Sequence, residues 1–429
     1  MEAAVAAPTA PPTASPATHV PAWHHVARHA VMAEPTHDEM ARFNFLANLT
    51  KRISMLSPGN RLAWDRRVQP SFGAQHGHPI EDRDDARKAM LADPYFQAWS
   101  SIRRANMEMR QQAGRSIVLR QVNELNAKAK AINEGAATLR LDPTTKVPHY
   151  LQVTDNHCMP GSYHTELGPD DVSAAANYDC GIFVTTGGAM GRLLDGGGKA
   201  IATHLLETWP AFRPKRILDL GCGLGHNTLP LAQAYPDAEV IAVDTGAPML
   251  RYGHARAKSL GIDNVTFVQA DAQFLDTWDE GRWARELGSE SKAGLGTTLD
   301  GAFDYIQTVM FWHETCRSTF FDLFANVHRW LAPGGLTLHV EQPQYTEDMD
   351  LFEQFIRDWD SWFNNEPFWS QMHDIDVFDA MEQVGFPRTD QVAFRAAAPA
   401  ELIGDQTGQP EDHGRAAIWN VFGAWKATE

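Results

Sequence analysis

Residues 216–230 read RILDLGCGLGHNTLP, and this stretch decides how the rest of the chain is interpreted. Its first residues form a short apolar run typical of a buried strand, and Gly221, Gly223 and Gly225 follow. The residues after these glycines predict a helix over 228–235. A strand, a glycine-rich turn and a helix N-terminus form a binding site for a polar ligand, because glycine lets a ligand approach the backbone.

The glycine spacing narrows the kind of ligand. A dinucleotide fingerprint reads G-x-G-x-x-G, whereas His226 stands where the last glycine of that pattern would fall after Gly223. The third glycine is Gly225 instead, which gives D-x-G-x-G-x-G counted from Asp219. The spacing therefore argues against a nicotinamide-dependent dehydrogenase.

Two further strands are expected after the glycine turn, at 239–244 and 264–271, with helices between the strands. This alternation predicts an α/β fold with a parallel, doubly wound sheet. Ligands of such sheets bind outside the carboxyl ends of the strands, where Asp219, Asp244 and Asp271 all fall. Three carboxylates at successive strand ends are a more specific signal than the glycines alone.

Several motifs in succession resemble those of class I S-adenosylmethionine-dependent methyltransferases. ILDLGCGLG, VIAVDTGAPML and VTFVQADAQFL resemble the first three, and LDGAFDYIQTVMFWHE and HRWLAPGGLTLHVE resemble the fourth and fifth strands. The resemblance covers about residues 200–345. It implies a doubly wound, mostly parallel, seven-stranded Rossmann-like sheet and S-adenosyl-L-methionine as the cofactor.

The resemblance also implies a set of cofactor-binding residues. Asp244 would bind the ribose, Asp271 would accept from the adenine amino group, and Gly221 and Gly223 would approach the methionine part. The full set is Asp219, Gly221, Gly223, Asp244, Thr245, Met249, Asp271, Ala272 and Thr308.

Methyl transfer from a sulfonium is an in-line displacement that depends on alignment of the reacting groups. A hydroxyl or acidic carbon acceptor also needs a base, and His313, after the fourth strand, is the first candidate. His164, Glu314 and Glu341 are weaker candidates, and a packing role for His313 is an alternative. An amine or thiol acceptor would need no base.

The chain divides into four parts by composition. Residues 1–22 are rich in Ala, Pro and Thr and predict a disordered tail, and 23–140 predict a helical cap or dimerisation domain. A Pro- and Gly-rich lid or linker spans 141–199. The methyltransferase-like domain takes 200–429, with a substrate-capping, aromatic-rich insert at 345–370. A polar loop is expected at 69–78, a short strand at 182–185 and a solvated insert at 277–298.

The 141–199 segment holds the residues considered for a metal. His157, Cys158 and His164 could in principle be ligands, but their spacing fits no standard site, so no metal is predicted. Tyr163, His164 and Tyr178 are instead expected to lie in a lid near the substrate.

Composition limits the kind of partner. The chain has 429 residues with 37 Lys+Arg and 54 Asp+Glu, a net charge of −17, which disfavours nucleic acids and anionic membranes. Its 4 cysteines form no C-x-x-C motif, and no apolar run is long enough to cross a membrane. A cytoplasmic protein is expected, with a homodimer through the N-terminal helices as a further hypothesis.

Three functions follow from these observations. The leading one is methyl transfer to a small, apolar or aromatic metabolite at an O, N or C atom, the aromatic insert being the hint to its chemistry. A catalytically silent cofactor-binding or scaffold protein on the same fold is the second. A protein methyltransferase is the third.

Overall fold

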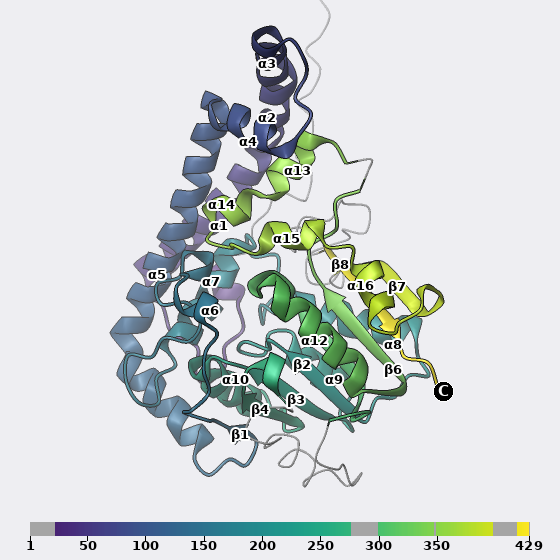
Figure 1. The fold of residues 1–429 in the computed structure, drawn as a ribbon. Coiled ribbons are helices and arrows are strands. Elements are labelled where there is room, and N and C mark those ends of the chain that lie inside the picture. The colour runs from purple at the N-terminus through teal and green to yellow at the C-terminus, as the bar shows by residue number, and fades with distance from the viewer. Residues whose placement is uncertain (1–21, 276–298, 347–348, 398–417, 429) are drawn as a thin grey trace, which may run out of the picture.

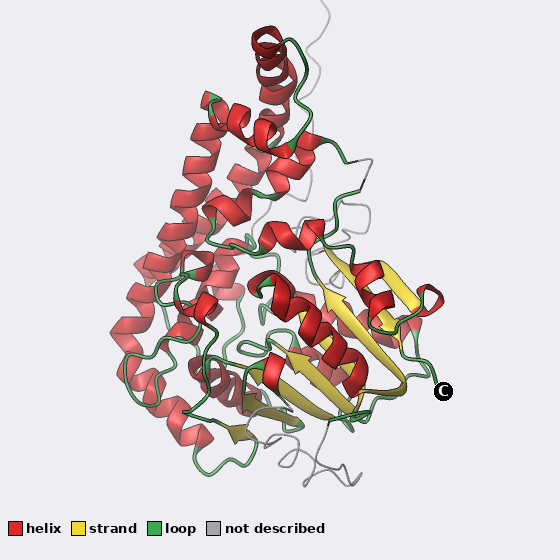
Figure 2. Cartoon of the chain, viewed as in Figure 1, coloured by secondary structure: helices red, strands yellow, loops and turns green. Residues whose placement is uncertain are grey.

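A computed structural model describes residues 22–275, 299–346, 349–397 and 418–428. Most of the expected N-terminal tail and the insert at 277–298 lie outside the described residues. A twisted sheet forms one half of the molecule, and helices cover both of its faces. Further helices build a cap beyond the carboxyl ends of the central strands (Figures 1 and 2).

The sheet has 8 strands in the order β1-β4-β3-β2-β5-β6-β8-β7. Strands β1 to β6 run parallel, and β8 is antiparallel to both of its neighbours. The strands are β1 (Leu139–Arg140), β2 (Arg216–Leu220), β3 (Glu239–Asp244), β4 (Val265–Gln269), β5 (Phe303–Val309), β6 (Leu331–Val340), β7 (Gln391–Ala397) and β8 (Ile418–Trp425). The doubly wound fold is confirmed. Seven strands were expected, and the described residues form eight, because β1, at the end of the helical region, pairs with β4 as an additional outer strand.

Two hydrophobic clusters sandwich the sheet, because side chains alternate between its faces. Ile217 of β2 packs into one cluster and Leu218 into the other. The first cluster lies under α8 (Gly196–Thr208), α9 (Thr228–Ala234) and α10 (Ala247–Ser259), and the second under α12 (Arg317–Trp330) and α16 (Val377–Gln383). Every residue of β2 is buried, as expected for a central parallel strand.

The cap is helical, as expected. Its helices are α1 (His37–Leu56), α2 (Pro58–Ala63), η3 (Trp64–Val68), α3 (Gln69–His76), α4 (Arg83–Leu91) and α5 (Pro94–Asn133). The polar loop expected at 69–78 is wrong: α3 occupies most of it, with a proline in its first turn and Gly77 ending it at φ 80°.

Helix α5 joins the cap to the sheet domain. Its first part packs Phe96 and Trp99 into a cluster that Phe352, Phe355 and Trp359 of the expected insert also enter. Its second part packs on α7 (Ser173–Thr185) and α10 in the cluster under the sheet. The insert helices α13 (Leu351–Arg357), α14 (Trp359–Phe363) and α15 (Trp369–Asp374) therefore complete the cap (Figure 1).

The lid segment also differs from expectation. The short strand expected at 182–185 is wrong, because these β-branched and aromatic residues continue the buried helix α7 that begins in an alanine-rich run. Short turns occupy much of the remaining chain. They are η2 (Trp23–His25), α6 (His149–Gln152), η4 (Asn156–Cys158), η5 (Ala272–Phe274), η7 (Trp312–Glu314) and η8 (Arg388–Asp390).

Candidate active site

A cavity of about 580 Å³ lies where the carboxyl ends of the central strands meet the cap. The glycine turn and the residues after β3, β4 and β5 line it on the side of the sheet. Ile53, Trp99 and Met107 of the cap and Ile356 of the insert line it on the other side. One cavity thus joins the ligand site expected from the sequence to a chamber under the cap that has apolar and polar walls.

The glycine turn borders this cavity with its backbone. Gly221, Gly223 and Gly225 have φ values of 72°, 52° and 85°, a region that favours glycine. A Cβ on Gly223 would meet no atom within 4 Å, so its backbone faces open space. A Cβ on Gly221 would fall 2.2 Å from the ring of Phe311, so the Phe311 side chain covers the backbone at Gly221.

Asp244 at the end of β3 fixes the turn. Its two carboxylate oxygens accept the backbone N–H groups of Gly223 and Gly246, at 2.9 and 2.8 Å, and the residue lines the cavity. Burial raises the pKa of the Asp244 carboxyl, and burial also raises that of Asp271 at the end of β4. Asp244 therefore offers carboxylate lone pairs beside an open glycine backbone, and these lone pairs can accept hydrogen bonds from the two hydroxyls of a ribose.

The cavity separates the expected cofactor residues into two groups. It brings together Gly221, Gly223, Asp244, Thr245, Met249, Asp271 and Ala272. Asp219 and Thr308 are not among its lining residues. Asp219 is 1% exposed and accepts a hydrogen bond from the Thr228 hydroxyl, and burial raises its pKa to about 7. Thr308 is fully buried against the ring of His339, at 2.9 Å. Both side chains therefore pack behind the wall of the cavity.

Asp179, a buried carboxylate that the sequence did not single out, contacts His226, the residue that follows the last glycine of the turn. Asp179 of α7 contacts Nε2 of His226 at 2.8 Å, Nε2 of His29 at 2.9 Å and the Tyr252 hydroxyl at 2.7 Å. Burial opposes its charge, but the hydrogen bonds from His226 and His29 hold the pKa of Asp179 well below its usual range. The histidine that breaks the dinucleotide pattern is thus a structural partner of α7.

His313 lies in the wall of the cavity but is paired. Its Nδ1 is 2.7 Å from one oxygen of Glu341, and its backbone N–H donates to the other at 3.1 Å. Burial lowers the pKa of His313, but the Glu341 carboxylate outweighs burial and raises it to about 9. A ring that is protonated at neutral pH cannot accept a proton, so the geometry argues against His313 as the general base.

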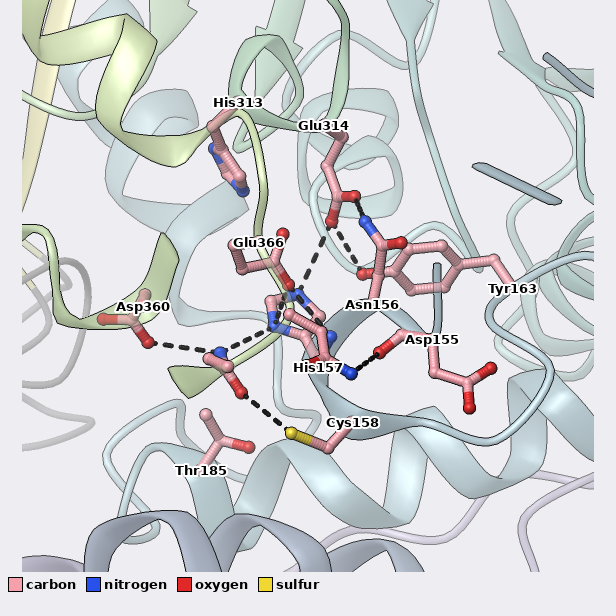
Figure 3. A network of polar contacts seen from close by, with 12 residues as sticks. Asp155, Asn156, His157, Cys158, Tyr163, Thr185, His313, Glu314, Asp360 and Glu366 are labelled. Carbon is pink, nitrogen blue, oxygen red and sulfur yellow. Dashed lines mark hydrogen bonds and ion pairs between the residues drawn. The ribbon is translucent and has the colours of Figure 1, made fainter. Parts of the chain in front are cut away.

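A polar network that we call the Glu314 cluster stands beside His313 (Figure 3). It consists of Asn156, His157, Tyr163, Glu314 and Glu366, from three distant parts of the chain. The Tyr163 hydroxyl donates to Glu314 at 3.0 Å, and Asn156 donates to the other oxygen of that carboxylate. His157 lies between the two carboxylates, 3.6 Å from Glu314 and 2.9 Å from Glu366. His164 also lines the cavity, and burial lowers its pKa.

Ligand-type side chains gather in the same cluster. His157, Glu314 and Glu366 each place one nitrogen or oxygen within 4.8 Å of the other two, the one group of three with such spacing among the described residues. Cys158 and His164, considered for a metal from the sequence, are not part of this group. Sequence reasoning missed Glu366 because nothing in the aromatic insert distinguishes it.

Comparisons with known proteins match the segment of the chain that carries the glycine turn. A family model described as a methyltransferase domain matches residues 217–283. A trans-aconitate 2-methyltransferase of Rhodopseudomonas palustris is 47% identical over 89 residues, 21% of this chain and 30% of the relative. A demethylmenaquinone methyltransferase of Thermus thermophilus is 32% identical over 130 residues, 30% and 48% of the two chains. A 23S rRNA (uracil(1939)-C(5))-methyltransferase of Shewanella sediminis is 35% identical over 103 residues, 23% and 21%.

The chain thus spans less than half the length of these curated relatives. Among solved structures, phosphoethanolamine N-methyltransferase 2 of Haemonchus contortus in complex with S-adenosyl-L-methionine is 18% identical, with 58% of this chain and 57% of that chain covered and a TM-score of 0.37. The glycine turn and the strand-end carboxylates lie in residues 217–283, which match the methyltransferase domain model, and this segment is similar to class I S-adenosylmethionine-dependent methyltransferases.

Proposed function

We propose that this protein transfers the methyl group of S-adenosyl-L-methionine to a small molecule bound under the cap. The observation that carries the proposal is the shared cavity: the glycine turn, Asp244 and Asp271 border the same space as the chamber under the cap. A methyl donor and a methyl acceptor held in one cavity can satisfy the main need of an in-line displacement, which is alignment. The bound cofactor supplies the activated methyl group.

The residues present fit this cofactor. The open backbone at Gly223 admits a ligand, and Asp244 stands beside it with lone pairs left for two hydroxyls. Asp271 lines the cavity at the end of the next strand, where a carboxylate can accept from an adenine amino group. Asp219 and Thr308 are left out of the proposed site.

A small acceptor is favoured by what surrounds the chamber. Side chains of α1, α5 and the insert line it, among them Ile53, Trp99 and Ile356, so an apolar part of an acceptor can pack against these walls. The net charge of −17 also opposes binding of a nucleic-acid backbone. A free metabolite with an apolar or aromatic part matches these walls better than a protein or an rRNA segment does.

Calorimetric titration of the full chain tests the cofactor. We expect S-adenosyl-L-methionine to bind and a nicotinamide dinucleotide not to bind. Asp244→Ala should weaken binding about 5- to 150-fold, the equivalent of roughly 1–3 kcal/mol for a lost charged acceptor. Asp237→Ala, an exposed aspartate in the turn before β3, is the control and should bind as the wild type does. Binding of the dinucleotide alone would contradict the proposal.

Turnover separates the proposal from its alternatives. Labelled cofactor incubated with the protein and a metabolite extract should yield a labelled small molecule. A silent scaffold would bind the cofactor and label nothing, and a protein methyltransferase would label only macromolecules.

Other expectations concern location and assembly. Among the described residues no helix is long and apolar enough to cross a membrane. A cytoplasmic location and a homodimer through the N-terminal helices stay predictions.

A further inference from the structure

We propose that Glu314 takes a proton from the acceptor during methyl transfer, and that the acceptor is a small molecule whose reacting atom is a hydroxyl or an ammonium group. This inference rests on the proposed function and names the substrate class of the same site. His157, Glu366 and Tyr163 serve as positioning residues for Glu314.

The position of Glu314 suits this role. It ends η7, the turn that follows the central strand β5, and it lines the cavity with His157 and Tyr163. Hydrogen bonds from Tyr163 and Asn156 reach both of its oxygens and hold the carboxylate in place. A proton acceptor must lie within reach of the methyl-accepting group, and the loop after β5 borders the cavity beside the glycine turn, where a Cβ on Gly221 would fall 2.2 Å from the ring of Phe311.

The arrangement of His157 distinguishes a proton-sharing cluster from a metal site. Glu366 lies 2.9 Å from Nδ1 of the ring, and Glu314 lies 3.6 Å from Nε2. The two carboxylates thus occupy opposite nitrogens of one imidazole. In a metal site the histidine would bind the ion through one ring nitrogen, and both carboxylates would lie on the side of that nitrogen. A protonated histidine between two carboxylates instead directs each of its two ring N–H groups toward one carboxylate.

Glu366 supplies a second, independent observation. Its side chain is fully buried, and its second oxygen, Oε2, has no hydrogen-bond partner. In Figure 3 this oxygen points toward the side chains of His313 and Glu314. A buried carboxylate left partly unpaired is costly, and its negative charge favours a proton on its neighbour.

The charges around Glu314 act in this direction. Burial raises the pKa of Glu314, the Glu366 carboxylate raises it further, and the combined effect brings it to about 7. His157, His313 and the hydrogen bond from Tyr163 oppose that shift in pKa. At neutral pH the carboxylate is therefore both ionised in part and basic enough to hold a proton.

The step balances with the groups named. The bond between the acceptor oxygen or nitrogen and the methyl carbon forms as the carbon–sulfur bond breaks, and the electron pair of that bond stays on sulfur. The proton of the hydroxyl or ammonium passes to the Glu314 carboxylate and then to solvent. Transfer of a proton by a positioned side chain contributes about 10²- to 10⁴-fold to the rate of such steps.

A titration without substrate tests the cluster first. In the full chain labelled with ¹³C at the glutamate carboxyls, we expect one signal to titrate near pH 7 and to vanish in Glu314→Gln. Glu366→Gln should move that midpoint down by about one pH unit and His157→Gln should move it up, because removing an anion and removing a cation act in opposite directions. If every glutamate titrates below pH 6, the assignment is wrong.

Turnover tests the substrate class. Labelled cofactor is offered with a panel of phenols and primary amines, and separately with pyridines and thioethers, whose reacting atoms carry no proton at neutral pH. We expect product from the first panel, a loss of about 100-fold or more in Glu314→Gln, and cofactor affinity unchanged in that variant. Glu382→Gln, on the surface helix α16, is the control and should turn over normally. Product from pyridines or thioethers alone, or wild-type turnover in Glu314→Gln, would overturn the inference.

The two tests separate this inference from the proposed function. If the wild type binds no S-adenosyl-L-methionine, the proposed function fails, while the carboxyl titration still reports on the cluster. Metal analysis of the purified chain completes the design. One equivalent of a divalent ion that is lost in both Glu366→Gln and His157→Gln would contradict the proton-sharing arrangement.

Discussion

Replacement of Asp179 by Asn should both destabilise the protein and loosen the glycine turn. Asp179 is 1% exposed and accepts hydrogen bonds from His29, His226 and Tyr252, which lie in the N-terminal segment, the glycine turn and α10. Asparagine keeps the shape of the side chain but removes the charge. It also places an NH₂ group where one of the donors now points.

The size of the effect follows from these contacts. A hydrogen bond to a charged acceptor contributes about 1.5–3 kcal/mol, and the asparagine oxygen can retain at most two of the three, since Oδ2 accepts from both His29 and Tyr252. Breaking a buried charged network by changing one partner typically costs about 3–5 kcal/mol. We therefore expect the free energy of unfolding to fall by about 3–5 kcal/mol. We also expect weaker cofactor binding, because His226 lies in the turn.

Urea unfolding followed by tryptophan fluorescence measures the first effect, and calorimetric titration with S-adenosyl-L-methionine measures the second. Asp171→Asn is the matched control: this fully buried aspartate accepts hydrogen bonds from Ser173, the first residue of the same helix, and from Asn126 and Leu167, none of which lies in the turn. The control should lose stability without losing affinity. A change below about 0.5 kcal/mol in Asp179→Asn, or equal losses of affinity in the two variants, would refute the reasoning.

Two further predictions concern His339 in the sheet and the glycine turn after β2. Burial lowers the pKa of His339 to about 3, so the unfolded chain binds the proton more readily and the stability that neutral His339 gives is lost as the pH falls below 6.5. Between pH 6.5 and 4.5 protonation of His339 in the unfolded chain should lower the free energy of unfolding by roughly 2–3 kcal/mol. His339→Gln should therefore flatten the pH dependence of the free energy of unfolding in urea. An unchanged slope would contradict this assignment. Gly221→Ala should lower the free energy of unfolding by more than the roughly 1–2 kcal/mol of its backbone conformation, because its Cβ meets Phe311, whereas Gly223→Ala should mainly weaken cofactor binding. Equal effects of the two alanines on stability and binding would show that the turn is not divided in this way.

The sheet could be predicted because each strand carries its own signal. The glycine turn and the acidic residues at 244 and 271 lie within or directly after apolar runs, and parallel topology brings their ends to one edge. The cap boundaries were less accessible. The insert joins the cap through Phe352, Phe355 and Trp359, and helical periodicity alone does not say which partner an apolar face packs against.

The two expected cofactor residues that do not line the cavity share one structural feature. Asp219 and Thr308 each lie at the end of a strand that lines the site, but side chains alternate between the faces of a sheet, and theirs point toward Thr228 and His339. Family resemblance assigns positions along a strand, and only packing decides which way a given side chain points.

The base illustrates the same limit at the level of chemistry. His313 and Glu314 are adjacent, and free histidine, with a pKa near 6.5, is the better base on intrinsic grounds. Their neighbours reverse this order: Glu341 holds a proton on His313, and burial beside Glu366 makes Glu314 more basic. Both neighbours come from beyond residue 340, so no local motif around 313 carries the information. The assignment of a base in such a site requires the contacts between distant segments, because these contacts decide which of two adjacent groups is free to accept a proton.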